Sequence, residues 1–275
     1  IDYTCSSTQI SGMSKNAFES YLFKDGKPMA LTSLNKSDEA PFQYGHLSLK
    51  DILAVRDKRL AQTIDTVLLY NGRGFTRFNT GMESTSSTGY GVAKYDNEAI
   101  PEGFRSQSGK NYTHAPLFWL SVIYLNYAEA CAELGNITQD DLDKSINLLK
   151  DRAGLPHLNP IVGFSDPANN HGVSDLIWEI RRERRCELMF DNDNRYWDLI
   201  RWHQLDKLDT TKYPDIILGA NVANDMDGCE ANKVGKYIDG SKDGSRIYDK
   251  KHYLYPIPTG QIALNPQLAP NNPGW

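Results

Sequence analysis

The charged side chains best placed to do chemistry gather in one stretch, residues 183–202 of the 275-residue chain. They are Glu183, Arg184, Glu187, Arg195, Asp198 and Arg201. Two carboxylates that flank a substrate bond are the catalytic pair of a glycoside hydrolase. The same residues can instead form ion pairs between helices, because the planar guanidinium of arginine binds a carboxylate through two hydrogen bonds.

The spacing of these residues favours ion pairs over catalysis. An apolar stripe through Leu176 and Ile180 continues, at helical spacing, through Glu183, Arg184 and Glu187. Charged groups therefore stand where a buried face is expected, and a buried charge is costly unless it is paired. Each carboxylate has an arginine within reach. We therefore predict a structural ion-pair network and no catalytic residue.

Helices must position this network, and helical periodicity predicts four of them in its neighbourhood. They cover residues 117–134, 140–153, 174–190 and 195–205. The first two, joined by a short turn, are similar to one tetratricopeptide repeat. One repeat cannot bury its own apolar face, so we expect the pair over 173–208, and helices outside this chain, to be its partners.

The remaining chain is rich in loops on both sides of this helical core over 117–208. Residues 1–116 are expected to pack on the helices as a loop-rich portion, and 209–275 form a loop-rich tail. Shorter elements are predicted as helices over 15–23 and 48–60, a strand over 63–69, and an extended segment over 253–258 packed against the helices. The predicted fold is mainly α, with extensive irregular loops and room for a short β-hairpin within 71–91.

Composition excludes several classes of partner. The net charge of −5 argues against nucleic acid. No apolar run approaches the length of a membrane span. The four cysteines and six histidines show no metal-ligand spacing. We therefore expect neither a metal ion nor another cofactor.

Several motifs together resemble the SusD/RagB family. The strongest are E-R-R-C-E-L at 183–188 and R-Y-W-D-L-I-R-W at 195–202, followed by N-Y-A-E-A-C-A-E-L-G at 126–135 and I-N-L-L-K-D-R-A-G-L-P at 146–156. Y-P-I-P, N-P-Q-L and N-N-P-G-W resemble the closing segment of the family, and D-G-K-P and R-D-K-R-L at 56–60 are weaker matches. The matches keep the order of the family and span most of 117–275.

The resemblance implies one SusD-like domain, an α-α superhelix, that lacks its amino-terminal part. Members are outer-membrane lipoproteins of the cell surface that capture oligosaccharides or polysaccharides for a SusC-like TonB-dependent transporter. The function it implies is glycan binding without catalysis, with a membrane link only through a lipid anchor absent from this chain. A glycoside hydrolase with paired carboxylates and a helical-repeat adaptor that binds only proteins remain as alternatives.

Ligand contacts are expected from aromatic and guanidinium groups on the loops before the helical core. Aromatic faces suit sugar rings, and the candidates are Arg73, Phe75, Tyr90 and Phe104. The same aromatic residues could instead pack the loop onto the helices. Since none of these groups titrates near neutrality, binding is expected to be largely independent of pH.

Overall fold

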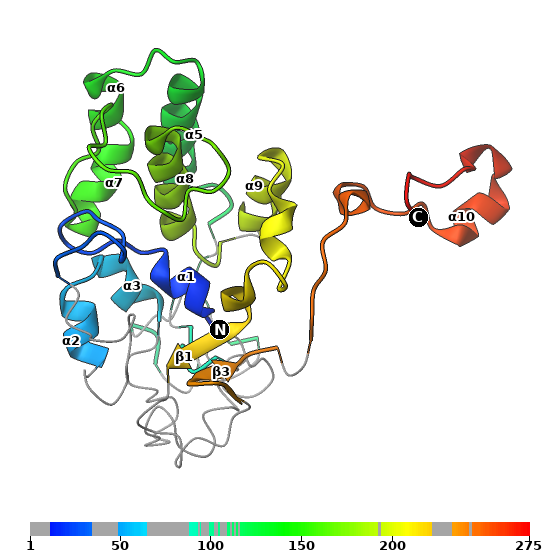
Figure 1. Cartoon of the computed structure of the whole chain (residues 1–275), viewed down its shortest axis with the longest axis horizontal. Helices are drawn as coiled ribbons and strands as arrows, with labels where there is room; N and C mark the ends of the chain where they lie inside the picture. Colours follow the sequence, from blue (N-terminus) through cyan, green and yellow to red (C-terminus); the bar gives the residue numbers. More distant parts are fainter. Residues whose placement is uncertain are drawn as a thin grey trace.

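The computed structural model describes residues 12–34, 49–64, 88–92, 94, 99–101, 104, 109–110, 112, 114, 116–191, 194–221, 233–241 and 244–275. Within these ranges the chain is mainly helical, as the periodicity predicts. Figure 1 shows a helical layer at the top, a second layer of short helices below it, and a small sheet beneath that layer.

The helical layer is built from α5 (Leu120–Glu133), α6 (Gln139–Asp143), α7 (Ile146–Ala153) and α8 (Asp175–Glu187). Helix α5 packs on α8, and α6 and α7 pack on α5. Their shared core consists of Leu125, Ala128, Leu142, Ile146, Leu149, Leu158, Ile180 and Leu188. Helix α8 begins where the sequence predicts, because the Ser174 hydroxyl accepts a hydrogen bond from the Ile177 amide at 3.2 Å.

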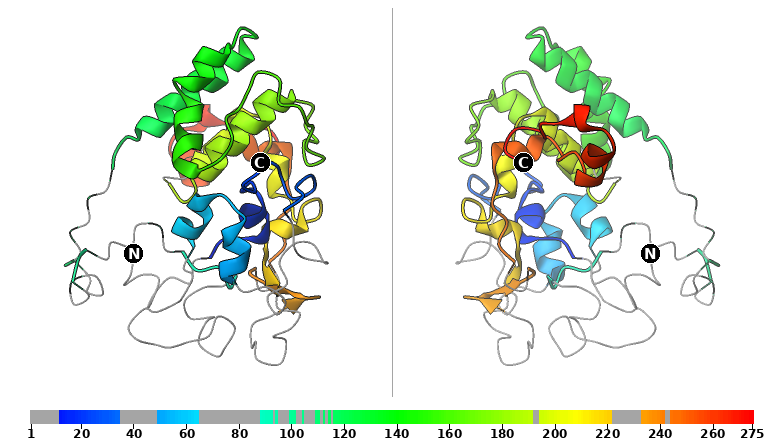
Figure 2. Two further views of the ribbon diagram at one scale, coloured as in Figure 1. Left: turned by 90° about the vertical axis from the view of Figure 1, so that its left-hand side faces the viewer. Right: turned by 90° about the vertical axis from the view of Figure 1, so that its right-hand side faces the viewer.

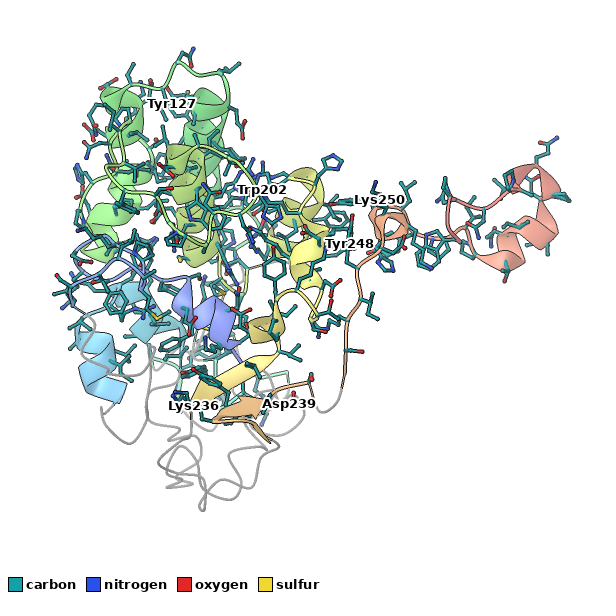
Figure 3. The ribbon with its side chains drawn as sticks, in the orientation of Figure 1. Tyr127, Trp202, Lys236, Asp239, Tyr248 and Lys250 are labelled. Atoms are coloured by element: carbon teal, nitrogen blue, oxygen red, sulfur yellow. The ribbon has the colours of Figure 1, made fainter. Side chains whose placement is uncertain are left out.

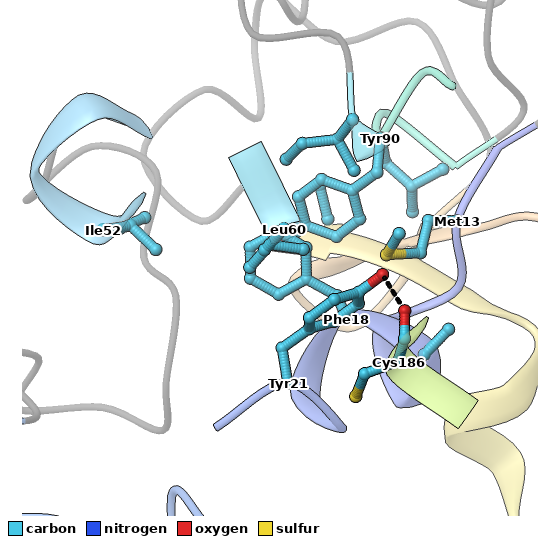
Figure 4. Packing of buried hydrophobic residues seen from close by; sticks show 11 residues of the cluster. Met13, Phe18, Tyr21, Ile52, Leu60, Tyr90 and Cys186 are labelled. Atoms are coloured by element: carbon cyan, nitrogen blue, oxygen red, sulfur yellow. Dashed lines mark hydrogen bonds between the residues drawn. The ribbon is translucent and has the colours of Figure 1, made fainter. Parts of the chain in front are cut away.

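The second layer contains α1 (Lys15–Glu19), α2 (Leu49–Ala54) and α3 (Lys58–Thr63), whereas α9 (Asn194–Arg201) lies beside α8 (Figure 1). Its core joins residues that are far apart in the chain: Met13, Ala17, Phe18, Tyr21, Ile52, Leu60, Ile64, Tyr90, Cys186, Ala220 and Ile238. Figure 4 shows this cluster, in which the Tyr21 hydroxyl donates to the Cys186 carbonyl oxygen at 3.2 Å. Residues before the helical core and residues after it therefore share one apolar centre with α8.

The sheet has three antiparallel strands in the order β1 (Leu218–Asn221), β3 (Tyr237–Asp239), β2 (Lys233–Val234). Strands β2 and β3 form a hairpin whose turn places Gly235 at a φ of 58°, a conformation that glycine adopts without strain. This hairpin lies in the tail that the sequence predicts as loop. The segment 71–87, where a hairpin seemed possible, lies outside the described residues.

Several predicted helices are shorter or divided in the structure. The helix expected over 140–153 breaks between α6 and α7, where the Ser145 hydroxyl donates to the Asp141 carbonyl oxygen at 2.5 Å and competes with the helical backbone bond. The helix expected over 48–60 divides at Asp57, which caps α3. The helix over 195–205 ends at Arg201, because His203 takes a left-handed φ of 53° and a 3-10 turn, Leu205–Leu208, follows.

Smaller predicted elements also differ. The first helix covers only Lys15–Glu19 of 15–23. Of the strand expected over 63–69, Thr63 ends α3, Ile64 forms an isolated bridge with Val92, and the rest lies outside the described residues.

The carboxyl-terminal segment contains the 3-10 turns Pro214–Ile216, Lys250–Tyr253 and Pro266–Leu268 and helix α10 (Thr259–Leu264). Figures 1 and 2 show α10 and the chain end standing away from the helices. The prediction that 253–258 packs on the helices is confirmed only in part, through two tyrosine hydroxyls. That of Tyr253 accepts from the Leu205 amide at 3.1 Å, and that of the exposed Tyr255 lies 3.2 Å from the Tyr196 hydroxyl of α9.

Candidate functional site

The charged network predicted from the sequence is organised around Arg59 of α3. Its guanidinium contacts Asp57 at 2.6 Å and Glu187 at 3.0 Å, and it also pairs with Glu183. Lys150 of α7 approaches the other oxygen of Glu183 at 3.5 Å. The three helices α3, α7 and α8 are therefore held together by buried charges of opposite sign.

These partners keep Glu183 ionised. Burial alone would raise the pKa of Glu183, but the charges and hydrogen bonds of Arg59 and Lys150 outweigh it and lower that pKa to about 2. The carboxylates of Glu183 and Asp57 hold the pKa of Arg59 well above its ordinary value, although burial acts in the opposite direction. A general acid needs a raised pKa, so this carboxylate is suited to packing and not to proton donation.

A second set of ion pairs joins α5, α8 and α9. Asp198 accepts from Arg184 at 2.7 Å and from Arg201 at 2.9 Å. Arg201 also holds Glu129 of α5 at 2.5 Å, and the indole nitrogen of Trp202 donates to that carboxylate at 2.6 Å. This arrangement fixes the middle and the end of α9 against the helical layer.

The structure confirms part of the predicted pairing and corrects the rest. Arg184 and Arg201 pair with Asp198 as expected, but Glu183 and Glu187 take their partners from outside the motif. Those partners are Arg59, Lys150 and, for Glu187, also Arg152. Arg59 was missed as a partner, although it belongs to the R-D-K-R-L match at 56–60. Arg195 pairs with no carboxylate of the described residues and lines a cavity instead.

This cavity, called the cationic pocket below, has a volume of about 620 Å³. It lies between α1, α8, α9 and the two 3-10 turns that follow α9, and the loops 28–30 and 166–170 close it. Its charged lining residues are Glu19, Asp166, Arg181, Arg182, Arg185, Arg195, Lys207, Asp215 and Arg246. The volume is that of a small-molecule site.

Two tryptophans line the pocket, and cations cover their rings. Trp202 is labelled in Figure 3. It lies under Arg181 and Arg201, whose guanidinium carbons are 4.5 and 4.6 Å from the ring centre. Trp178 lies under Lys207 at 4.6 Å, and its indole nitrogen donates to Asp166 at 3.1 Å. Each ring thus orients a cation at the pocket wall.

The ligand contacts predicted from the sequence do not gather at this pocket. Arg73 and Phe75 lie outside the described residues. Tyr90 is only 2% exposed and stacks on Phe18 at 4.3 Å between ring centres, so it packs in the core and offers no face to a ligand. Phe104 is 48% exposed and meets Tyr112 edge-on at 6.4 Å, but it does not line the pocket. Its role in binding stays a prediction.

The described part of the chain also shows which other sites it lacks. Among these residues no group of three or more histidine, cysteine, aspartate or glutamate side chains is arranged to hold a metal ion. No helix in the same part of the chain has the length and apolar character needed to cross a membrane.

Comparisons with known proteins agree with the fold. The chain is similar to the crystal structure, at 2.70 Å resolution, of a SusD-like protein from Bacteroides fragilis NCTC 9343, with 22% identity and a TM-score of 0.59. The match covers 96% of this chain but 47% of that protein, so the chain spans about half the length of the related structure. No curated protein matches the sequence. The sequence model of the SusD family matches residues 4–275, and the chain therefore belongs to the SusD family.

Proposed function

We propose that this chain is part of a cell-surface glycan-binding protein that delivers oligosaccharide to a TonB-dependent transporter of the outer membrane. The observation that carries the proposal is the match to the SusD family over residues 4–275. The fold shared with the Bacteroides protein supports it. The proposed partners are a glycan and a SusC-like transporter, and the proposed location is the outer surface of the outer membrane.

The electrostatics of the charged network support binding without cleavage. Asp198 and Glu183 are buried beside arginine or lysine, and Glu183 has a pKa near 2. A retaining glycosidase needs two carboxyl groups about 5–5.5 Å apart in an open cleft, one of them with a raised pKa. Neither carboxylate of the network is a free group of this kind.

One carboxyl group of the pocket wall keeps the hydrolase alternative testable. Burial raises the pKa of Glu19, although the neighbouring Lys15, at 2.5 Å, opposes the shift. A carboxyl with a raised pKa on a cavity wall is the feature expected of a general acid. If Glu19 is the general acid of a hydrolase, Glu19→Gln is expected to abolish the activity.

The test uses the full-length protein with a panel of polysaccharides. We expect retention in an affinity gel that contains the right glycan, with no release of reducing sugar. Released sugar that disappears in Glu19→Gln or Glu183→Gln would overturn the proposal in favour of a hydrolase. The absence of retention by every glycan of the panel would also contradict it.

The delivery step has a separate test. The full-length protein is expected to co-purify with a TonB-dependent transporter from outer membranes. Recovery of the protein without any such transporter, under conditions in which the glycan binds, would contradict the delivery role but not glycan binding.

A further inference from the structure

Three half-buried cations of the pocket wall have no carboxylate partner among the described residues. They are Arg185 of α8, Arg195 of α9 and Lys207 of the 3-10 turn that follows. Arg185 donates to the Asn16 side-chain oxygen at 2.7 Å, and the amide of Asn16 in turn donates to Asp215 at 2.6 Å. The charge of Arg185 therefore meets a carboxylate only through an intervening amide.

The acidic groups of the same wall are already engaged. Asp166 accepts from Arg182 and from the Trp178 indole. Glu19 pairs with Lys15 at 2.5 Å. The wall therefore carries a surplus of positive charge, in a chain whose net charge is −5.

The surplus of positive charge makes the cations of the pocket wall repel one another. The pKa of Lys207 is lowered to about 7, mainly by desolvation and to a smaller extent by the positive charges of Arg195 and Arg185. Desolvation and the charge of Arg185 likewise lower the pKa of Arg195 to about 9. An anion placed among the three cations would remove this mutual repulsion.

The rings of the pocket favour recognition by charge over stacking. Lys207 covers Trp178 at 4.6 Å, and Arg181 covers Trp202 at 4.5 Å, with Arg195 also over that ring at 5.8 Å. A neutral sugar that stacked on either indole would have to displace a cation. A carboxylate can instead bind the guanidinium forks and the ammonium where they stand.

We propose that the cationic pocket binds the carboxylate of an acidic sugar, with Arg185, Arg195 and Lys207 as its ligands. The inference rests on the proposed function and deepens it, since it names the class of glycan. The pocket volume of about 620 Å³ accommodates a short oligosaccharide around the charged unit.

The experiment is isothermal titration calorimetry of the full-length protein with two matched probes. One probe is trigalacturonate, and the other is its fully methyl-esterified form, which has the same sugar rings and no charge. We expect the acid to bind at least about tenfold more tightly than the ester. Equal affinities for the two would overturn the inference and leave glycan binding intact.

Substitutions assign the effect to the pocket. Lys207→Met and Arg195→Met are each expected to weaken binding of the acid by about tenfold or more, without a matching loss for the ester. Lys212→Met is the control, because it removes the same charge from an exposed residue that does not line the pocket. If the acid is preferred but Lys207→Met and Arg195→Met both bind as the wild type does, the site is elsewhere and the inference is wrong.

The pH dependence of binding gives a second readout. Lys207 faces Arg195, Arg185 and Arg181, with Asp206 as the nearby acid. It is charged below its pKa of about 7 and neutral above it, so affinity for the acid should fall as the pH rises from about 6 to 8.5. This fall should be absent in Lys207→Met. A pH-independent affinity in the wild type would contradict the role of Lys207.

A failure of the proposed function looks different. If neither probe binds, and no glycan of the wider panel binds, both the proposed function and this inference are overturned. Binding of neutral glycans alone, unaffected by Lys207→Met, would refute only the acidic-sugar inference.

Discussion

Arg59→Met tests whether the charged network holds the helices together. The substitution keeps most of the length of the side chain and removes the guanidinium that α3 presents to α8. It leaves Asp57, Glu183 and Glu187 without their common partner, and the Asp57 and Glu183 side chains are only 1% and 2% exposed. Removing one partner of a buried ion pair costs about 3–5 kcal/mol.

The pKa of Glu183 gives a second estimate of the free energy with which this ion pair stabilises the fold. Its pKa falls from 4.5 to about 2 on folding. At about 1.36 kcal/mol per unit, this corresponds to roughly 3 kcal/mol of stabilisation near neutral pH. Because the folded pKa is depressed, this contribution is present above pH 4.5 and is lost as the pH falls towards 2. The stability difference between wild type and Arg59→Met should therefore shrink over that interval.

The assay is urea denaturation at about pH 7 and pH 3.5, with free energies of unfolding from the transition midpoints. Arg152→Met is the matched control, since Arg152 also pairs with Glu187 but its side chain is 61% exposed. An exposed pair contributes about 1 kcal/mol or less. Equal losses for Arg59→Met and Arg152→Met, or a loss for Arg59→Met that is the same at both pH values, would refute the reasoning.

Three further predictions follow from the packing. Gly219→Ala is expected to lower the free energy of unfolding by about 1–3 kcal/mol, because an added Cβ would lie 2.2 Å from the Thr88 carbonyl oxygen; an unchanged urea midpoint would contradict this. Phe190→Gly is expected to lower the free energy of unfolding by about 1–3 kcal/mol, because Phe190 is only 42% exposed, and the lost apolar burial and the more flexible unfolded chain outweigh the relief of its φ of 64°; a raised melting temperature would count against this. The chain alone should self-associate through α5, where Leu120 and Ile123 are 63% and 60% exposed. Light scattering should show association that Leu120→Lys with Ile123→Lys reduces, and a monomeric wild type would show this to be wrong.

Helix α8 shows which features of the structure the local sequence can predict. Ser174 as N-cap and the apolar stripe through Ile180 predict the helix and its buried face, and both are found. The charged residues on that stripe predict ion pairs, and Arg184 and Arg201 do pair with Asp198. The helix cap, the buried face and the Arg201–Asp198 pair depend on neighbours within one or two helical turns, so the sequence itself contains their cause. The Arg184–Asp198 pair joins two helices that are adjacent in the chain.

The helix breaks mark where local patterns are insufficient. Periodicity predicts one helix over 140–153, and a single hydroxyl at Ser145 divides it. Strands β1 and β3 pair although residues 222–232 and strand β2 lie between them in the chain. Such short segments show no alternation that distinguishes them from loops. A local side-chain hydrogen bond accompanies the first case, and long-range backbone pairing decides the second.

The sequence by itself determined that the chain is mainly helical, that α8 carries buried charge, and which family its motifs resemble. Only the tertiary structure decided that Arg59, 124 residues away, is the partner of Glu183. It also decided that Tyr90 packs inside and that Arg195 and Lys207 face one cavity. The physical reason is that propensity and periodicity act within a few residues. The partner of a charge or a ring depends on which distant segments pack together in the fold, and no local pattern in the sequence contains that information.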